Sequence, residues 1–495
     1  MTAPDLFSCD VAVVKAELLR SFSMLMDPVF EAAQSGLLTP REAERRTWTV
    51  MVPLGAMLLT ALFATLCRRE TQRAVAELGL DMADVRLRMD VDYWAKLKST
   101  FGALSFPWYA FRRMKTTHVP ARELFPLHPD VRSTELLLEW ESSLASDHPF
   151  RKAQEALLFF SHGAADVEDT TIERHAVLVG QTVPPEWLYV SVAKIRDVLR
   201  KRATIDPRSG LPMINVSTDA HALRIFEGET WKSVWKMING IRLWCIDRDT
   251  GETIHLGGEF TTGDYRDVVR RLRARAASGH LPFDGKYGEG VVAQICIPTD
   301  GLDWIADHVL PLYPGALASL DPYHVVEQVA DTARATLPKA RVKTVIAQAR
   351  KAIGIRDRRG RTHYRKGPRR VLHTVRRSGL TGSGQRLLDE VLVPLEGEIK
   401  RGKKRFKRLM KFVRRNMFRL DYGALRRRGA TIGSGAMESV HRTGSQTRLK
   451  RAGCRWTPEV AQAILNLRML TLSGRWDEYW ALPDLAARVA ARSAA

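Results

Sequence analysis

The feature that most limits the fold of this chain is a series of strand-like segments that begins near residue 211. The first three, "MINVSTD", "GIRLWCIDRD" and "ETIHLGGEF", are rich in alternating or β-branched residues, as strands are. The second and third are joined by "DRDTGE", whose Thr-Gly pair indicates a hairpin turn. We therefore predict that the sheet starts with three antiparallel strands.

The strands that follow alternate with helices. A basic helical segment, "YRDVVRRLRARAAS", precedes "VVAQICIPTDG", an uninterrupted apolar run typical of a buried parallel strand. The helix "LDWIADHVL", the strand "GALASLD" and a helix from Pro322 complete the series. The order β-β-β-α-β-α-β-α predicts an α/β core with a mixed five-stranded sheet, whose parallel strands are added through crossover helices. This order suggests a ribonuclease H-like catalytic domain.

Acidic residues close two of the predicted strands. Asp219 ends the first strand and Asp300 follows the fourth, and these strands are neighbours in a sheet of this topology. Clustered carboxylates are costly unless a cation neutralises them, and hard oxygen ligands suit Mg²⁺ or Mn²⁺. Two such ions activate a water or a 3′-hydroxyl for in-line phosphoryl transfer. We therefore expect a metal site here, although caps and turns also favour an aspartate at a strand end.

The charge of the chain points to a polyanionic partner. Its 495 residues, enough for two or three domains, include 77 Lys and Arg against 55 Asp and Glu, a formal net charge of +22. Such an excess indicates DNA, RNA or an anionic membrane surface. The five cysteines are scattered without a CxxC pair, which argues against a zinc site or a disulfide framework and fits a reducing cytoplasm.

One uncharged stretch raises the question of a membrane span. Residues 47–67 contain no charged side chain, but Pro53 shortens the helical run to about 14 residues. We interpret this stretch as a buried core helix, and the N-terminus has no signal-peptide pattern. The protein is therefore expected to be soluble and cytoplasmic, without a membrane partner.

The region before the sheet is mainly helical and divides into two parts. Residues 1–130 form the first. In the second, residues 131–205, two short helices flank a Gly-containing turn, as in a helix-turn-helix. The later helix of this pair is expected to present four side chains to a DNA groove: Thr170, Thr171, Arg174 and His175. An ordinary helical hairpin explains the same pattern, so both interpretations stay open.

After the first part of the core, residues 206–325, the chain is helical and strongly basic over residues 326–430. Two basic runs are the densest in the chain, "RDRRGRTHYRKGPRR" and "KRGKKRFKRLMKFVRR". In the second run apolar residues interleave with basic ones, as in a folded helix with one charged side. We expect that side to contact DNA phosphates through Lys403, Lys404, Arg405 and Arg408.

Four motifs carry a family resemblance: "STDAHALR", "IPTDGLDWI", "LDPYHVVEQV" and "GSGAMESVHRTGSQTRLKRAGCRW". Together they resemble bacterial insertion-sequence transposases of the DDE type, in which an all-helical insertion interrupts a ribonuclease H-like domain before its final Glu. This group is related to the Mutator-like and hAT transposases. The likeness runs from about residue 130 to 480. One departure is that residues 100–130 contain no cysteine, whereas many members carry a zinc-ribbon-like stretch there.

The resemblance implies a set of catalytic residues. Asp219 matches the first catalytic aspartate, Asp300 the second, and Glu438, in "GSGAMES", the glutamate; together they would hold two Mg²⁺ or Mn²⁺ ions. "DPYH" resembles the D-x-x-H signature of these families, which makes Asp321 a rival second ligand and His324 a residue that braces the site. We prefer Asp300, because the fourth strand adjoins the first while the fifth lies one position further out. Asp303 is a weaker rival.

Basic residues follow the glutamate. Arg442 lies one helical turn beyond Glu438 on the same face, where it would pair with the carboxylate or clamp a phosphate. Arg448 and Lys450 extend the positive surface and are expected to contact DNA. For Trp456, which resembles a tryptophan usual in the motif, core packing is the favoured interpretation.

The resemblance implies a DNA transposase that performs metal-dependent strand cleavage and strand transfer for an insertion sequence. Its core would be completed by residues 431–495, which carry the Glu motif. Its partners would be the double-stranded terminal inverted repeats and target DNA, and a homo-oligomer is expected because two element ends must be brought together. The location implied is the bacterial cytoplasm, in association with the nucleoid. Two alternatives remain: a ribonuclease H-like nuclease that does not join strands, and a domesticated or inactive transposase that only binds DNA.

Overall fold

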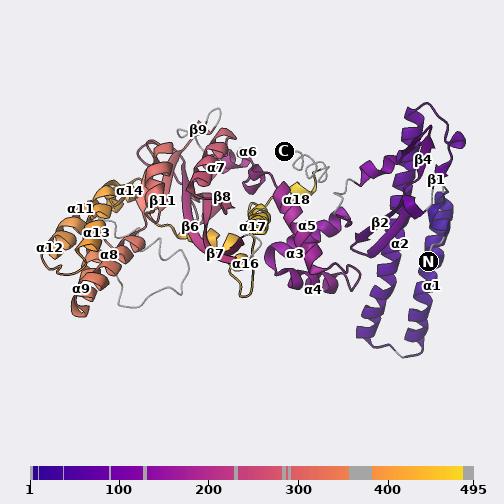
Figure 1. The fold of residues 1–495 in the computed structure, drawn as a ribbon, viewed down its shortest axis with the longest axis horizontal. Coiled ribbons are helices and arrows are strands. Elements are labelled where there is room, and N and C mark those ends of the chain that lie inside the picture. Colours follow the sequence, from indigo (N-terminus) through magenta and orange to yellow (C-terminus); the bar gives the residue numbers. More distant parts are fainter. Residues whose placement is uncertain are drawn as a thin grey trace. The chain divides into compact units, whose positions relative to one another are not determined.

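The structure, a computed structural model, forms two compact units: residues 1–182 together with residues 480–495, and Val183–Tyr479 (Figure 1). The residues that it describes are 4–8, 10–36, 38–88, 91–125, 131–227, 232–280, 286–287, 291–355 and 382–482. The basic run at residues 356–370 therefore lies outside the described residues. The first division of the chain falls after residue 182, so the helices expected to bind DNA belong to the N-terminal unit.

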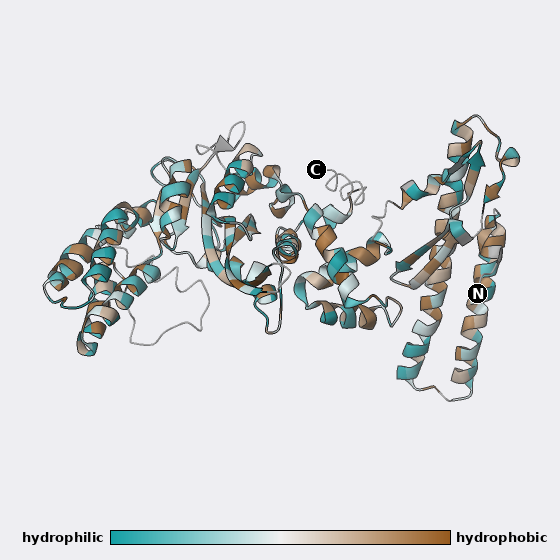
Figure 2. Cartoon of the chain, in the orientation of Figure 1, coloured by the Kyte–Doolittle hydropathy of each residue, from teal (hydrophilic) through white to brown (hydrophobic). Residues whose placement is uncertain are grey.

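The N-terminal unit begins with two long helices, α1 (Val11–Gln34) and α2 (Pro40–Glu77). A capping box of Thr39 and Glu42 and the proline at the first position start α2, because they satisfy or remove free backbone donors. The helix continues through Pro53, so the expected break there is absent. The expectation of a buried core helix is wrong: only 22% of its most apolar window is buried. Within the described residues, α2 alone is long and apolar enough to span a membrane (Figure 2).

Short strands pack on α2. β2 (Trp94–Ser99) pairs with β3 (Gly102–Pro107), and β4 (Ala110–Arg113) lies between β1 (Leu87–Arg88) and β5 (Thr116–His118). The core of this region joins side chains of α2 to those of β2 and β3: Ala64, Cys67, Leu97, Leu104 and Phe106. Short 3-10 turns occupy Pro4–Phe7, Met82–Asp84, Val91–Tyr93 and Pro120–Leu124.

Three helices complete the N-terminal unit: α3 (Glu135–Asp147), α4 (Phe150–Phe160) and α5 (Asp169–Thr182). Residues 161–168 connect α4 to α5, which is longer than the three- or four-residue turn of a helix-turn-helix. Thr170 and Arg174 are exposed, and Thr171 is half-buried. His175 is buried and bonds Glu141 of α3, so its expected place on the exposed face is wrong.

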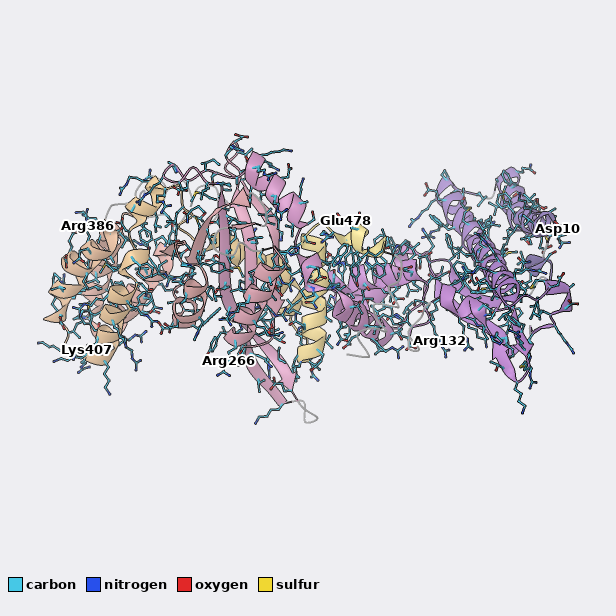
Figure 3. All side chains as sticks on the ribbon, turned by 90° about the horizontal axis from the view of Figure 1, so that it is seen from above. Asp10, Arg132, Arg266, Arg386, Lys407 and Glu478 are labelled. Carbon is cyan, nitrogen blue, oxygen red and sulfur yellow. The ribbon has the colours of Figure 1, made fainter. Side chains whose placement is uncertain are left out.

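The second unit is built on a five-stranded sheet in the order β12-β11-β6-β7-β8. The strands are β6 (Met213–Glu227), β7 (Lys232–Ile246), β8 (Thr253–Thr261), β11 (Gln294–Thr299) and β12 (Leu317–Leu320). β6, β7 and β8 are antiparallel, whereas β11 is parallel to both β6 and β12. This confirms the predicted mixed sheet and the contact between its first and fourth strands. β6 and β7 also extend together beyond the other strands (Figure 3).

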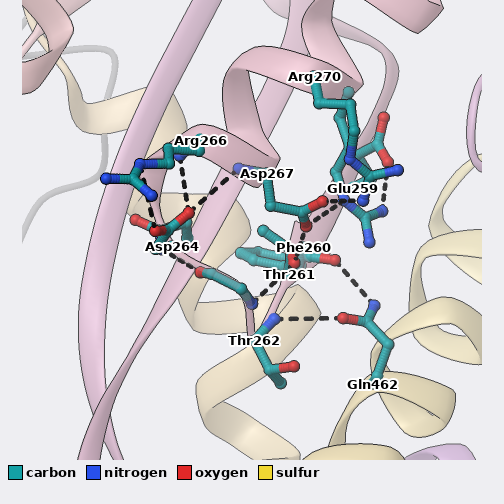
Figure 4. A network of polar contacts seen from close by, with 12 residues as sticks. Glu259, Phe260, Thr261, Thr262, Asp264, Arg266, Asp267, Arg270 and Gln462 are labelled. Atoms are coloured by element: carbon teal, nitrogen blue, oxygen red, sulfur yellow. Dashed lines mark hydrogen bonds and ion pairs between the residues drawn. The ribbon is translucent and has the colours of Figure 1, made fainter.

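Helix α7 (Tyr265–Ala277) is fixed to the sheet by a buried ionic network (Figure 4). Arg271 bonds Glu259 of β8 at 2.7 Å and Asp267 at 2.8 Å, and Arg275 lies 3.4 Å from Glu259. Since Glu259 is almost inaccessible to solvent, its charge requires these partners. The chain then runs through β9 (Lys286–Tyr287) and β10 (Val291–Val292) to β11.

Where the structure describes it, the basic region after the sheet is mainly helical. Its described helices are α8 (Pro322–Thr336), α9 (Lys339–Ala352), α11 (Ser383–Leu387), α12 (Val393–Glu396), α13 (Lys403–Arg415) and α14 (Tyr422–Arg427). One apolar core unites them with β11 and β12. On α13 one side packs into that core and the other carries exposed basic residues.

The C-terminal segment returns to the sheet. It contains α15 (Gly435–Val440), a π-helical stretch (His441–Gln446), α16 (Thr447–Leu449), α17 (Pro458–Leu472) and α18 (Trp476–Trp480). Before the sheet come a 3-10 turn (Pro185–Leu188) and α6 (Val192–Lys201). Further π or 3-10 turns lie at Ile305–Val309, Leu310–Leu312, Leu388–Leu392 and Met417–Arg419.

Candidate active site

Asp219 lies within β6, whereas Asp300 and Asp321 directly follow β11 and β12, the next two strands of the sheet. In the parallel pair β6–β11, Cys296 is the partner of Asn215, and the same offset brings Asp300 level with Asp219. In the pair β11–β12, Thr299 is the partner of Leu320, which brings Asp321 level with Asp300. Asp219 does not end its strand as expected, because β6 continues to Glu227 by pairing with β7.

The carboxyl groups of Asp219 and Asp300 interact. Burial, and next the negative charge of Asp300, raise the pKa of Asp219 to about 7. The backbone N–H of Ala220 donates to Asp219 Oδ1 at 2.7 Å, and the N–H of Leu302 donates to Asp300 Oδ1 at 3.2 Å. Each carboxylate is therefore held by a backbone donor while the two remain close enough to repel each other.

The turn after Asp300 depends on glycine. Gly301 has φ +99°, and a Cβ there would lie 2.8 Å from Leu320 Cδ2 and 3.1 Å from the Phe412 ring. This close approach packs the Asp300 turn between β12 and α13. Asp303, a few residues on, is largely exposed and forms an ion pair with Arg415 at 3.3 Å, so it is directed to the helical region.

The carboxylate of Asp321 is buried and fully hydrogen-bonded within the fold. It is 4% exposed and caps α8, with Oδ1 accepting from the N–H of Tyr323 at 2.7 Å and of His324 at 3.4 Å. Its Oδ2 accepts from the N–H of Ser434 at 2.8 Å and from the Ser434 hydroxyl at 3.1 Å. Both oxygens are thus occupied in joining the start of α8 to the segment that leads into α15.

Glu438 lies on α15, and its side chain is 60% exposed. Its Oε1 accepts from the Ser434 hydroxyl at 3.3 Å and lies 3.8 Å from Nε2 of His324. Nδ1 of His324 is 3.4 Å from Glu327, and the imidazole is also near enough to Asp219 to oppose the rise in its pKa. His324 is therefore placed between the glutamate and the aspartate pair.

Close packing brings α15 onto the face of the sheet that carries Asp219. Gly240 of β7 is the partner of Asp219, and a Cβ on it would lie 2.6 Å from both Met437 Cε and Phe260 Cε1. The buried guanidinium of Arg242 donates to the carbonyl of Ala436. Glu259 faces α7 while Phe260 faces α15, so the two helices cover opposite faces of the sheet.

The donor set suits a hard divalent cation only in part. Asp219 and Asp300 offer adjacent oxygen ligands whose mutual repulsion a cation would relieve. However, no three His, Cys, Asp or Glu side chains gather as a metal-binding group within the described residues. Of the expected cluster, Asp219 and Asp300 lie together, whereas Glu438 lies on the adjoining helix α15 and does not form a three-residue group with them.

A pair of histidines behind Asp219 was not anticipated from the sequence. Nδ1 of His221 is 2.6 Å from Nδ1 of His441, Nε2 of His441 lies 3.6 Å from Asp219 Oδ2, and Ser445 bonds His221 at 3.1 Å. Burial, and next the neighbouring His441, lower the pKa of His221 to about 3, and burial lowers that of His441 to about 4. Both rings are therefore neutral near pH 7. The two-residue spacing of Asp219 and His221 was the available signal, since it sets both on one face.

Arg419 is a second residue that sequence reasoning missed. Its guanidinium is inaccessible to solvent and donates to the Thr299 hydroxyl and, at 2.8 Å, to Asn416 Oδ1. Burial lowers the pKa of Arg419 to about 10, and the Asp300 carboxylate opposes that change. A positive charge thus lies beneath the aspartate pair. One arginine among many in a basic region gave no signal of this role.

The residues expected to bind DNA fall into two groups. Lys403, Lys404, Arg405, Arg408 and Lys450 are exposed. Arg448 is buried with its guanidinium 4.6 Å from the ring centre of Trp456, so its expected DNA contact is wrong. Trp456 is buried and donates to the Leu449 carbonyl at 2.9 Å, which supports its expected packing role. Arg442 is exposed, and its expected pairing with Glu438 is not found among the described ion pairs.

The fold and site define an α/β protein whose mixed sheet carries adjacent carboxylates on parallel strands. No family model matches the sequence, and no curated protein matches it. Among solved structures, the chain is similar to one described as a Drosophila P element transposase strand transfer complex. The two are 10% identical with a TM-score of 0.32, over 69% of this chain and 93% of that one. A likeness of this size carries no argument about activity.

Proposed function

We propose that the protein is a DNA transposase of the DDE type, with a ribonuclease H-like core that cleaves DNA strands and transfers them to a target. The observation that carries this proposal is that Asp300, at the end of β11, adjoins Asp219 of the neighbouring parallel strand β6, with α15 and its Glu438 over the same face. The motif resemblance to insertion-sequence transposases supplies the reaction. Such an enzyme would act at the nucleoid in a bacterial cytoplasm.

Asp219 and Asp300 are the proposed metal ligands. Their adjacent carboxylates make a negative site that a hard cation would relieve. When bound, two Mg²⁺ or Mn²⁺ ions supply activation of a water or a 3′-hydroxyl and stabilisation of the leaving oxygen. Asp321 is instead proposed to hold the segment before α15, because both its oxygens already accept hydrogen bonds.

Glu438 is the proposed third acidic residue. Its exposed carboxylate contacts Ser434 and His324 among the described residues, and its exposure leaves it accessible to bound DNA and cation. His324 is proposed as a positioning residue that holds Glu438 beside the aspartate pair. His441, on the other side of Asp219, restricts that carboxylate from within the fold.

The exposed basic side of α13 is the proposed contact for the phosphates of double-stranded DNA. Lys403, Lys404, Arg405 and Arg408 project from a helix whose apolar side is fixed in the core. Terminal inverted repeats and target DNA are the proposed substrates. A homo-oligomer is proposed because two element ends must meet for strand transfer.

The test compares wild-type protein with Glu438→Gln on an element-end duplex supplied with Mg²⁺ or Mn²⁺. Wild type should nick the end and join it to a target duplex, and the variant should lose nicking while it binds DNA with similar affinity. Nicking at the wild-type rate by the variant would refute the role of Glu438. Cleavage without joining would instead identify a nuclease, and DNA binding without cleavage by wild type would leave the alternative of a protein that only binds DNA.

A further inference from the structure

Beyond Asp219, β6 and β7 continue as a two-stranded ribbon, defined here as residues 220–227 and 232–239. Its strands pair from Ala220–Asn239 to Glu227–Lys232. β8 pairs with β7 only as far as Asn239, the first position of the ribbon, and β11 pairs with β6 only through residues 213–215, so neither covers the remainder of the ribbon. The ribbon extends past the remainder of the sheet (Figure 3).

The two faces of the ribbon differ in exposure. Leu223, Ile225 and Ile238 point to one face and are buried against the protein. The other face presents Trp235, which is 75% exposed, and Met237, which is 48% exposed. Because successive side chains of a strand alternate, Arg224 shares this outer face, directly across from Trp235. Of the large apolar side chains described in residues 183–479, Trp235 is the most exposed.

Two arginines lie on or beside this outer face. Arg224 donates to Ser233 at 2.8 Å, and the guanidinium groups of Arg224 and Arg455 lie 5.9 and 5.7 Å from the ring centre of Phe226. Glu227 is already paired with Lys236 at 2.9 Å. Among the described residues, no ion pair gives Arg224 or Arg455 an acidic partner, so the outer face is net positive.

An open indole face among uncompensated cations matches one kind of ligand. Unpaired nucleic-acid bases stack on aromatic rings whatever their sequence, and nearby arginines bind the phosphates between them. A duplex offers no free base face to Trp235, because its bases are stacked on each other. The outer face therefore fits an unpaired strand better than a double helix.

We propose that the outer face of the ribbon, with Trp235, Met237 and Arg224, binds unpaired DNA that flanks the reacting site. This inference rests on the proposed function for the identity of the nucleic acid. Trp235 is five residues along the ribbon from the level of Asp219, roughly 17 Å, and it points to the opposite face of the strands. The ribbon thus holds a flanking strand and does not contact the scissile phosphate.

The binding test uses a single-stranded oligonucleotide that contains one 2-aminopurine, in buffer without divalent metal. Stacking on Trp235 should quench the probe, and Trp235→Ala should abolish most of the quenching and weaken binding about tenfold, whereas Trp235→Phe should retain much of both. Arg224→Ala should also weaken binding. Lys236→Ala, on the inner face of the same ribbon, is the matched control and should have a smaller effect.

Three outcomes would overturn the ribbon proposal. The first is unchanged quenching and affinity in Trp235→Ala. The second is an equal loss in Lys236→Ala and Arg224→Ala. The third is a wild-type dimer that Trp235→Ala converts to monomer without any effect on the probe, which would assign the face to a second copy of the chain.

The result is separable from the proposed function, because this binding needs no metal and no cleavage. Absence of metal-dependent nicking by wild type would refute the transposase proposal while the probe still reported stacking. If nicking occurs, Trp235→Ala should raise KM for a substrate with an unpaired flank and leave kcat nearly unchanged. A fall in kcat alone would contradict a flanking role.

Discussion

Asp300, the residue after the end of β11, lies beside Asp219 of the neighbouring parallel strand β6 and continues the offset that pairs Cys296 with Asn215. The relationship follows from strand register, so it does not depend on side-chain rotation. It also separates the two candidate ligands, because Asp321, level with Asp300 on the next strand, already accepts four hydrogen bonds. Mutation of each residue can therefore test whether Asp300 or Asp321 is the second metal ligand.

Asp300→Asn should abolish specific Mn²⁺ binding, measured by electron paramagnetic resonance, and metal-dependent nicking. Its effect on thermal stability should be small or stabilising, because it removes a charge that repels Asp219. Asp321→Asn should instead destabilise the protein by about 1–2 kcal/mol. Its amide oxygen still caps α8, but its NH2 group cannot accept the hydrogen bonds that Ser434 donates to Oδ2. Full Mn²⁺ affinity in Asp300→Asn together with loss in Asp321→Asn would reverse the assignment.

Gly240→Ala should destabilise the second unit by about 1–3 kcal/mol, because its methyl group would overlap Met437 and Phe260. Relief of this overlap should displace α15, which carries Glu438, and so reduce nicking by the protein. Thermal melting and the nicking assay measure the two effects. Gly397→Ala is the matched control, since nothing lies within 4 Å of its Cβ position, and it should change stability little. Equal melting temperatures of the two variants would contradict the packing argument.

Acid should remove the stabilisation that Asp206 provides. The hydrogen bond from Arg428 is the main cause that holds the pKa of Asp206 at about 2, below its ordinary value of 3.8. A lowered pKa stabilises the fold above pH 4, by about 2 kcal/mol here, and this contribution is lost as the pH falls toward 2. Urea unfolding at pH 3 to 6 should show a difference between wild type and Asp206→Asn that shrinks on acidification. A difference that grows would refute this sign.

Lys404→Ala combined with Arg408→Ala should reduce the salt dependence of duplex binding. Each phosphate contact contributes about 0.9 to the slope of log affinity against log salt, so the double variant should lower its magnitude by about two. Fluorescence anisotropy at several salt concentrations measures the slope. Arg341→Ala is the control, because Glu398 already holds that side chain at 3.0 Å. An unchanged slope in the double variant would exclude this side of α13 from DNA.

Much of the core could be predicted from sequence because its signals are local. Alternating and apolar runs predicted five strands in the correct order, and the basic and apolar residues of α13 predicted a helix with one charged side. Local patterns failed where burial depends on distant partners. Arg448 looked like another surface cation, and only the position of Trp456 shows that its guanidinium is covered.

In the N-terminal unit, local sequence patterns also failed to predict which side chains are buried. The uncharged stretch of α2 was expected in a core, because hydrophobicity alone indicates what a side chain prefers. The structure exposes Leu58, Leu62 and Leu66, because the described elements that pack on the helix, chiefly α1, β3 and short 3-10 turns, leave this side uncovered. His175 was likewise expected at the surface, but Glu141 binds it inside the three helices.

The sequence by itself determined the strand order, the basic side of α13 and the identity of the acidic residues, because each depends on neighbours a few positions away. Only the tertiary structure decided how those acidic residues differ. Register set Asp300 beside Asp219, capping and a bond to Ser434 engaged Asp321, and packing on Gly240 brought Glu438 to the same face. Contacts between residues eighty or more positions apart have no periodicity in the sequence, so only the folded chain defines them.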